Sequence, residues 1–358
     1  MKKRCLCAGL ASMLLFFGGC SRQENTEQPN SGDIPTNTSV TEQKTTETSS
    51  ITESTSKKAE MDNTSQTGYT TAVPQSYKTE SEHGGNVERL DYDSLDYVRD
   101  SSPITKTAYI YTPYGYDENN TEKRYDIIYL MHGWGGHAGE YFDYTSTKNV
   151  FDHLIENEDI PPVIIVSATF YNENSDTDFS GSIDELRQFH RDFEEKLMPA
   201  VENQYHTYAK DTTPEGLKAV RDHRIFGGFS LGSVTTWLEF CYDYDYIHYF
   251  LPMSGSCWYY GTYGDFQIEE NVDFIEQIVK NKNLDERGYF IYHTVGTEDA
   301  VKYQSEEMAK EMLSRKIFTT EHYVFYQKDG GLHDLDAVQE YLYNALPLFL
   351  AVINNKII

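Results

Sequence analysis

The chain has 358 residues, and its 57 Asp and Glu against 30 Lys and Arg give a formal net charge of −27 at pH 7. Such an excess of negative charge repels nucleic acid phosphates, so it excludes tight nucleic-acid binding as the main activity and predicts no nucleic acid partner. The length suits one large domain or two modest ones. The acidity favours solubility and says nothing about the fold.

The first twenty residues have the features of a targeting signal. Three basic residues, 2–4, precede an apolar run from Cys5 to Phe17 that is too short for a bilayer-spanning helix. The small residues directly before Cys20 resemble a bacterial lipoprotein signal, which implies a signal peptide of residues 1–19, cleavage before Cys20 and lipidation of its thiol. The alternative is an ordinary secretory peptide with an incidental cysteine. Both predict an extracytoplasmic protein, and the first predicts membrane attachment through lipid alone.

The next segment is rich in small polar residues. Ser or Thr occupies 23 of the 60 positions from Ser21 to Glu80, where Tyr69 and Tyr77 are the only aromatic residues. This composition cannot bury enough apolar surface to offset the entropy lost on ordering the backbone. The sequence therefore predicts a flexible linker over residues 20–84 and one folded domain over residues 85–358.

Strand and helix patterns alternate through the predicted domain. The clearest helical pattern runs from Leu186 to Val201 with spacings of three and four, and others cover Val301–Leu313 and Ala337–Val352. The alternation predicts the α/β class, with a mostly parallel sheet flanked by helices on both faces. The segments that predict strands are Thr107–Tyr111, Tyr125–Met131, Val163–Ala168, Arg224–Gly228, Phe250–Ser254, Tyr289–Val295 and Tyr323–Tyr326.

A Gly-x-Ser-x-Gly sequence from Gly228 to Gly232 follows one of these strands and precedes a helical pattern. Glycines on both sides of a serine allow a tight strand-to-helix turn that exposes the hydroxyl. The same turn aims the backbone N–H of Leu231 at a developing oxyanion. Ser230 is therefore the candidate nucleophile.

A second glycine turn, His132 to Gly136, follows the strand that ends at Met131. Its glycines allow main-chain amides near Trp134 to approach a substrate carbonyl as a second oxyanion donor. The alternative is a plain glycine turn with a histidine packed beneath it. His132 and His137 have no third ligand at a suitable spacing, so the sequence predicts no metal site.

A serine nucleophile needs a base, and the base needs an orienting carboxylate. Asp299 and His333 each follow the carboxyl end of a predicted strand, where sites form in open α/β sheets. The order Ser230, Asp299, His333 is that of the α/β-hydrolase fold. Glu298 remains an alternative acid. His223 is a weaker alternative base because it lies a strand length from the serine.

These motifs resemble carbohydrate esterase family 1, the feruloyl and acetyl xylan esterases, and the wider esterase D group. The resemblance implies Ser230 as nucleophile, Asp299 as acid, His333 as base, an oxyanion hole of the Leu231 and Trp134 amides, and no cofactor. Leu231 replaces a common methionine and Ser233 a usual glycine, and neither change removes an essential atom. The segments that carry the resemblance are Tyr109–Asp117, His132–Gly136, Pro162–Val166, Phe193–Pro199 and the triad residues.

The predicted function is hydrolysis of feruloyl or acetyl esters on plant cell-wall polysaccharide by an extracellular, lipid-anchored serine esterase. The expected partner is an acylated polysaccharide or oligosaccharide. One alternative is an acyltransferase of the mycolyltransferase type, which would exclude water so that a sugar hydroxyl accepts the acyl group. Another is a noncatalytic carbohydrate-binding lipoprotein, which the presence of a whole triad disfavours.

Two cysteines fall within the predicted domain. The helix that begins at Leu231 should carry Cys241 about 15 Å from the serine, whereas Cys257 follows the next strand back to the active-site edge. That separation exceeds the roughly 7 Å between alpha carbons that a disulfide spans, so both thiols are predicted to stay free. Trp134 is a candidate substrate-binding residue. The stretch Cys257, Trp258 and Tyr259 is expected either to wall the acyl or sugar pocket or to pack away from it.

Overall fold

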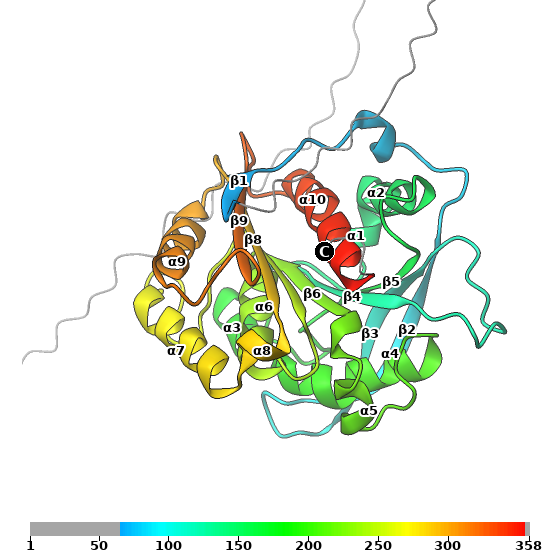
Figure 1. Cartoon of the computed structure of the whole chain (residues 1–358). Helices are drawn as coiled ribbons and strands as arrows, with labels where there is room; N and C mark the ends of the chain where they lie inside the picture. The colour runs from blue at the N-terminus through cyan, green and yellow to red at the C-terminus, as the bar shows by residue number, and fades with distance from the viewer. Residues whose placement is uncertain (1–64, 355–358) are drawn as a thin grey trace, which may run out of the picture. The chain divides into compact units, whose positions relative to one another are not determined.

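The structure, a computed structural model, describes residues 65–354 (Figure 1). The predicted signal peptide, Cys20 and the linker up to residue 64 lie outside the described residues. The strands are β1 (Thr67–Tyr69), β2 (Asn86–Leu95), β3 (Pro103–Thr112), β4 (Asp126–Met131), β5 (Val163–Ala168), β6 (Arg224–Phe229), β7 (Tyr249–Met253), β8 (Phe290–Gly296) and β9 (Tyr323–Lys328).

These strands form one nine-stranded sheet in the order β1-β9-β8-β7-β6-β4-β5-β3-β2. β3 runs antiparallel to both of its neighbours, and the other neighbouring pairs are parallel. β4, β5, β6 and β7 are buried along their whole length, which explains their nearly continuous apolar sequences. The predicted α/β-hydrolase fold, with a mostly parallel sheet, is confirmed.

Helices cover both faces of the sheet. α3 (Phe179–Asp192), α6 (Leu231–Tyr242), α7 (Ile268–Asn281) and α9 (Lys302–Ser314) contribute to the apolar core on one face. α1 (Glu140–Asp143), α2 (Thr145–Glu156) and α10 (Leu335–Ile353) contribute to the core on the other face. Figure 1 shows α10 and α2 together above the sheet and α3, α6 and α7 below it. Within the described part of the chain, no helix is both long and apolar enough to cross a membrane.

The clearest predicted helix, Leu186 to Val201, is interrupted. α3 continues through a π-helical turn, Phe193–Leu197, into α4 (Met198–Gln204). The remaining short helices are α5 (Pro214–Lys218) and α8 (Leu284–Arg287), with 3-10 turns at Gln75–Lys78 and Arg221–His223.

The domain begins earlier than the sequence predicted, because residues 65–84 are part of the fold rather than of the linker. β1 pairs in parallel with β9, with Thr67 opposite Phe325 and Tyr69 opposite Gln327. Farther along, the Tyr77 hydroxyl donates to Asp159 beside α2. A three-residue strand held by main-chain hydrogen bonds has no apolar pattern, so the composition of this segment could not reveal it.

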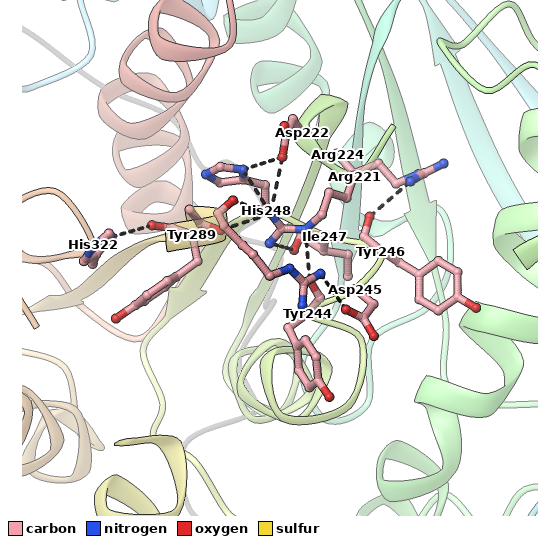
Figure 2. A network of polar contacts seen from close by, with 12 residues as sticks. Arg221, Asp222, Arg224, Tyr244, Asp245, Tyr246, Ile247, His248, Tyr289 and His322 are labelled. Carbon is pink, nitrogen blue, oxygen red and sulfur yellow. Dashed lines mark hydrogen bonds and ion pairs between the residues drawn. The ribbon is translucent and has the colours of Figure 1, made fainter. Parts of the chain in front are cut away.

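The amino end of β6 is fixed by two buried arginines (Figure 2). Arg224 donates to both carboxylate oxygens of Glu202, at 2.5 and 2.9 Å, and to the carbonyl of Tyr246 at 3.1 Å. Arg221 donates to four backbone carbonyls at 3.0 to 3.2 Å. These carbonyls belong to the turn into β7 and to the end of α8, at Tyr244, Ile247, Arg287 and Gly288.

Cys241 and Cys257 are both buried, and they are not bridged in this structure. The wide separation predicted from the sequence is wrong, because the two thiols are neighbours that hydrogen-bond to each other. The loop after β7 turns back along α6 instead of staying at the carboxyl edge, so it brings Cys257 to the far end of the helix. Trp237 of α6 donates to the carbonyl of Gly255 in this loop at 3.4 Å.

Candidate active site

Ser230 lies on the tight turn between β6 and α6, at the carboxyl edge of the sheet. Its φ of 59° and ψ of −115° are values that residues with a side chain rarely adopt. A Cβ on Gly228 would lie 2.3 Å from the carbonyl oxygen of Gly232, and one on Gly232 would lie 2.1 Å from that of Met131. Only glycine fits at either position, which is the physical reason for the Gly-x-Ser-x-Gly sequence.

The structure brings the three predicted triad residues together. His333 Nε2 lies 3.0 Å from Ser230 Oγ, and His333 Nδ1 lies 3.0 and 2.9 Å from the two carboxylate oxygens of Asp299. The Asp299 side chain is 0% exposed and that of His333 is 27% exposed. The backbone N–H of Val301 also donates to Asp299, at 2.7 Å. With Nδ1–H donating to Asp299, Nε2 is free to accept the serine proton.

The alternative acid and base lie elsewhere. Glu298 is exposed, and its backbone N–H donates to the carbonyl of Gly331 at 3.0 Å. His223 is at the amino end of β6, where Nδ1 lies 2.7 Å from Asp126 and the ring stacks on Tyr208 with centroids 3.6 Å apart. The geometry therefore favours Asp299 and His333 as the partners of the serine.

The predicted oxyanion turn lies directly against the serine. Gly136 N donates to the Gly133 carbonyl at 3.2 Å, and Gly135 has a φ of 74°. A positive φ at the third position is typical of a type II turn, and it requires glycine there. A Cβ on Gly133 would lie 3.1 Å from Ser230 Cβ. The Trp134 N–H at the second position of this turn is therefore close to the serine.

Leu231 is the first residue of α6, so its N–H has no carbonyl to bond within the helix. The same N–H lies at the positive end of the helix dipole, next to the serine hydroxyl. Together with the N–H of Trp134, it offers two donors for an oxygen that becomes negatively charged.

The oxyanion turn is supported from beneath by a buried histidine, which the sequence had offered as part of the alternative to an oxyanion role. His132 is fully buried, its Nδ1–H donates to the Gly133 carbonyl at 2.7 Å, and its Nε2 accepts from the Thr169 hydroxyl at 2.6 Å. Burial lowers the pKa of His132 to about 4, so the ring is neutral at pH 7. The Tyr171 hydroxyl accepts from Gly135 N at 3.4 Å and lies 2.7 Å from Ser182 Oγ in α3.

His132 follows β4, whereas Thr169 and Tyr171 follow β5. The only sequence signal for Thr169 and Tyr171 was their position after a strand. Among residues 65–354, no three His, Cys, Asp or Glu side chains form a cluster that could hold a metal ion.

An aromatic row begins at the oxyanion turn. Trp134 is 45% exposed, and its Nε1 donates to the Thr177 carbonyl at 3.1 Å. Its ring meets Phe179 edge to face at 5.4 Å, and Phe179 meets Tyr263 in the same way at 5.7 Å. Tyr263 is 43% exposed. The row therefore presents partly exposed ring surface that begins at the oxyanion turn.

The other predicted wall residues pack away from solvent. Cys257 is buried, and Trp258 is 2% exposed with Nε1 shared between Ser256 Oγ and Gln304 Oε1 at 3.1 and 3.0 Å. Tyr259 stacks on Phe274 of α7 with centroids 4.0 Å apart. Of the two expectations for this stretch, the structure favours packing away from the pocket, and Trp258 reaches the aromatic row only through Tyr263.

The loop after β7 lies behind the serine, and three side chains hold it through hydrogen bonds to one of its backbone carbonyls. The carbonyl of Gly255 accepts from His293 Nε2 at 3.1 Å, from Ser305 Oγ at 3.2 Å and from Trp237 Nε1 at 3.4 Å. Burial lowers the pKa of His293 to about 3, so the ring is neutral and donates from Nε2 only. A Cβ on Gly255 would lie 3.0 Å from the Ser230 carbonyl oxygen, so this loop closely supports the serine turn.

Comparison with known proteins places this geometry in context. The family model described as "Putative esterase" matches residues 104–349. Endo-1,4-beta-xylanase Y of Acetivibrio thermocellus is 32% identical over 285 residues, which cover 77% of this chain and 24% of the xylanase. An endo-1,4-beta-xylanase/feruloyl esterase of Xylanibacter ruminicola is 27% identical over 198 residues, or 54% of this chain and 24% of its own length. The chain thus spans about a quarter of the length of each of these relatives.

Two solved structures show the same fold. A serine-to-alanine variant of the feruloyl esterase module from Clostridium thermocellum, solved with sinapinate, is 31% identical with a TM-score of 0.68, covering 79% of this chain and 94% of the module. A ferulic acid esterase from Anaeromyces mucronatus is 18% identical with a TM-score of 0.58, covering 78% and 97%. The chain belongs to the esterase family of the matching model, in the carbohydrate esterase family 1 and esterase D-like group of α/β-hydrolases.

Proposed function

We propose that the chain is a serine esterase in which Ser230 is the nucleophile, His333 the general base and Asp299 the orienting acid. The observation that carries this proposal is the unbroken hydrogen-bonded series from Asp299 through His333 to Ser230, with distances of 2.9 to 3.0 Å. The backbone N–H groups of Leu231 and Trp134 lie close to the serine and supply the two oxyanion donors that acyl transfer requires.

In the first step, Ser230 Oγ attacks the ester carbonyl while His333 Nε2 takes the serine proton. The carbonyl oxygen gains negative charge and accepts hydrogen bonds from the N–H groups of Leu231 and Trp134. Asp299 holds the imidazole in the correct tautomer and stabilises the imidazolium. His333 then gives its proton to the leaving alcohol oxygen as the ester bond breaks, which leaves an acyl-serine.

In the second step, His333 takes a proton from water, and the resulting hydroxide attacks the acyl-serine. The carboxylic acid leaves and the proton returns to Ser230. The exposed fraction of the His333 side chain, 27%, gives water access to the base. This access favours hydrolysis over transfer to a sugar hydroxyl, because a transferase has to exclude water from the same position.

We infer that the substrate is a feruloyl or acetyl ester on plant xylan. One relative is named as a feruloyl esterase, and the module solved with sinapinate is 31% identical to this chain. The row of Trp134, Phe179 and Tyr263, which begins at the oxyanion turn, suits an aromatic acyl group, because aromatic rings stack edge to face on one another.

The test compares hydrolysis of feruloylated and acetylated xylan oligosaccharides at equal concentration, with Ser230→Ala as the control. Release of ferulate or acetate by the wild type, and not by the variant, supports the proposal. If neither ester is hydrolysed while the protein still binds xylan, a noncatalytic binding role is supported instead.

We also propose that the mature protein is extracytoplasmic and attached to the membrane by a lipid on Cys20, with the polar linker as a spacer. Detergent partitioning of the wild type, with Cys20→Ser as the control, tests this arrangement. Recovery of the wild type wholly in the aqueous phase, from cells with intact lipoprotein processing, would contradict it.

A further inference from the structure

The loop after β7 runs side by side with α6. At one end of this contact, Trp237 Nε1 of the helix donates to the Gly255 carbonyl at 3.4 Å. At the other end, the rings of Tyr242 and Tyr259 lie with centroids 5.6 Å apart. Cys241 and Cys257 lie between these two contacts, in matching positions on the helix and on the loop.

The two thiols face each other in the interior. Cys257 is 0% exposed and Cys241 is 6% exposed, and both belong to the same apolar core cluster. The Cys257 thiol is the hydrogen-bonding side-chain partner of Cys241. The proposed esterase mechanism uses neither sulfur.

We propose that Cys241 and Cys257 form a disulfide site that closes when the chain folds in the presence of a small-molecule disulfide such as oxidised glutathione. In the first exchange, one cysteine thiolate attacks the oxidant's S–S bond, which releases one glutathione thiolate and leaves a mixed disulfide. In the second exchange, the other cysteine thiolate attacks its neighbour's sulfur and releases the second glutathione. The two protons from the cysteine thiols end on the two released glutathiones, so atoms and electrons balance.

The bridge forms during folding rather than afterwards. Burial raises the pKa of Cys241 well above its usual range, so the thiolate that must attack is scarce in the folded protein. A partly folded chain exposes both thiols to water and to the oxidant. The folded, reduced protein should therefore react slowly with the same disulfide.

The bridge would stabilise the region behind the nucleophile. It joins the far end of α6, which begins beside Ser230, to the loop whose Gly255 touches the serine turn. Closing a loop over the 15 residues between the cysteines restricts the unfolded chain and raises the temperature of unfolding. The triad atoms keep their positions, because the two sulfurs are already neighbours in the reduced structure.

The experiment refolds the full chain in oxidised or in reduced glutathione and then cleaves it, without reduction, using a protease that cuts before aspartate. Asp243 and Asp245 lie between the two cysteines, so the fragments that carry Cys241 and Cys257 stay joined only through a disulfide. Mass spectrometry identifies the joined fragments, and calorimetry measures the unfolding midpoint of the intact protein. Cys241→Ala is the control, since it cannot form this bridge but keeps every other cysteine.

We expect joined fragments from the oxidised wild type and a midpoint roughly 5 °C above that of the reduced wild type, with no such shift in Cys241→Ala. Separate fragments from the oxidised wild type would overturn the proposal, whether or not the variant folds. An unchanged or lower midpoint would overturn the stabilising role, and an equal shift in Cys241→Ala would assign it to other cysteines. Because the readouts are fragment mass and unfolding temperature, the test is independent of the esterase activity.

Discussion

The amino edge of the central sheet, where the parallel strands begin, and its carboxyl edge, where they end, are built in opposite ways. At the amino edge, the guanidinium groups of Arg221 and Arg224 are buried and bonded to carbonyls and to a carboxylate. At the carboxyl edge, Ser230 and Ser254 have φ values of 59° and 60°, and the N–H of Leu231 has no acceptor within its helix. The amino edge therefore supplies rigidity, and the carboxyl edge keeps strained and unsatisfied groups for the reaction.

The largest effect that this comparison predicts is at the serine. Ser230→Ala should lower ester hydrolysis by several orders of magnitude while the urea unfolding midpoint stays unchanged, because the triad acts as one unit and contributes little to the core. Initial rates and circular dichroism in urea measure the two properties. Ser180→Ala, at an exposed serine in the first turn of α3, is the matched control and should keep full activity. Near-normal turnover by Ser230→Ala would show that the nucleophile is misassigned.

The acid can be tested against its neighbour. Asp299→Asn should reduce kcat by about a thousand-fold or more, because an amide can no longer accept from His333 Nδ1–H in both positions and favours the wrong tautomer. Glu298→Gln is the control and should stay within about two-fold of the wild type, since Glu298 is exposed. A mild effect at Asp299 with a severe one at Glu298 would move the acid one residue upstream.

At the amino edge the expected loss is in stability instead of catalysis. Arg224→Met should lower the free energy of unfolding by about 3–5 kcal/mol, because Glu202 would be left as a buried carboxylate without its partner. The folded fraction should keep the kcat of the wild type. The double variant Arg224→Met with Glu202→Leu should recover much of the stability, which urea denaturation measures. A catalytic defect at unchanged stability would break the distinction between the edges.

The smallest effect concerns two acids at the far end of α6. Burial raises the pKa of Asp243 to about 7 and that of Glu239 well above its usual range. While both are ionised, none of their four carboxyl oxygens has a hydrogen-bond donor among the described groups, and a shared proton supplies one. The charged groups that face the pair are Asp192, Glu194, Asp245 and Lys218.

Both acids bind protons more tightly in the folded state than in the unfolded chain, where they titrate near pH 4. Their stabilising contribution is therefore complete below about pH 4 and declines as the pH rises. The part from Asp243 is lost as the pH rises through about 7, and the raised pKa of Glu239 adds to the same decline. Glu239→Gln should flatten this decline and raise the free energy of unfolding at pH 8 by about 1 kcal/mol. Urea unfolding of both proteins at pH 5 and pH 8 measures it, and equal slopes would contradict it.

The site could be predicted from the sequence because its determinants are local. The turn at Ser230 admits only glycine at two fixed positions, and Asp299 and His333 each follow the end of a buried strand. Parallel strands place such ends at the same edge, so chain order alone was enough to bring the three residues together.

The features that could not be predicted depend on the paths of loops. The distance argued for Cys241 and Cys257 assumed that the chain stays at the edge after β7, and the loop instead turns back along α6. β2 was missed because it is an outermost strand of the sheet, with a polar sequence along which burial alternates. The support of the oxyanion turn by Tyr171 rests on one hydroxyl in a loop, which no sequence period marks.

The pairing of β1 with β9 has a mechanical consequence. β9 leads into the loop that carries His333, and its other side is paired with β8. A pull on the chain upstream of Thr67 would first shear the short β1–β9 ladder and then the two hydrogen bonds between the Asn344 amide and the backbone of Thr71. β1 can detach while β8 keeps β9 in the sheet. Tension on the preceding chain would therefore be released by the loss of the β1–β9 pairing before it displaced His333.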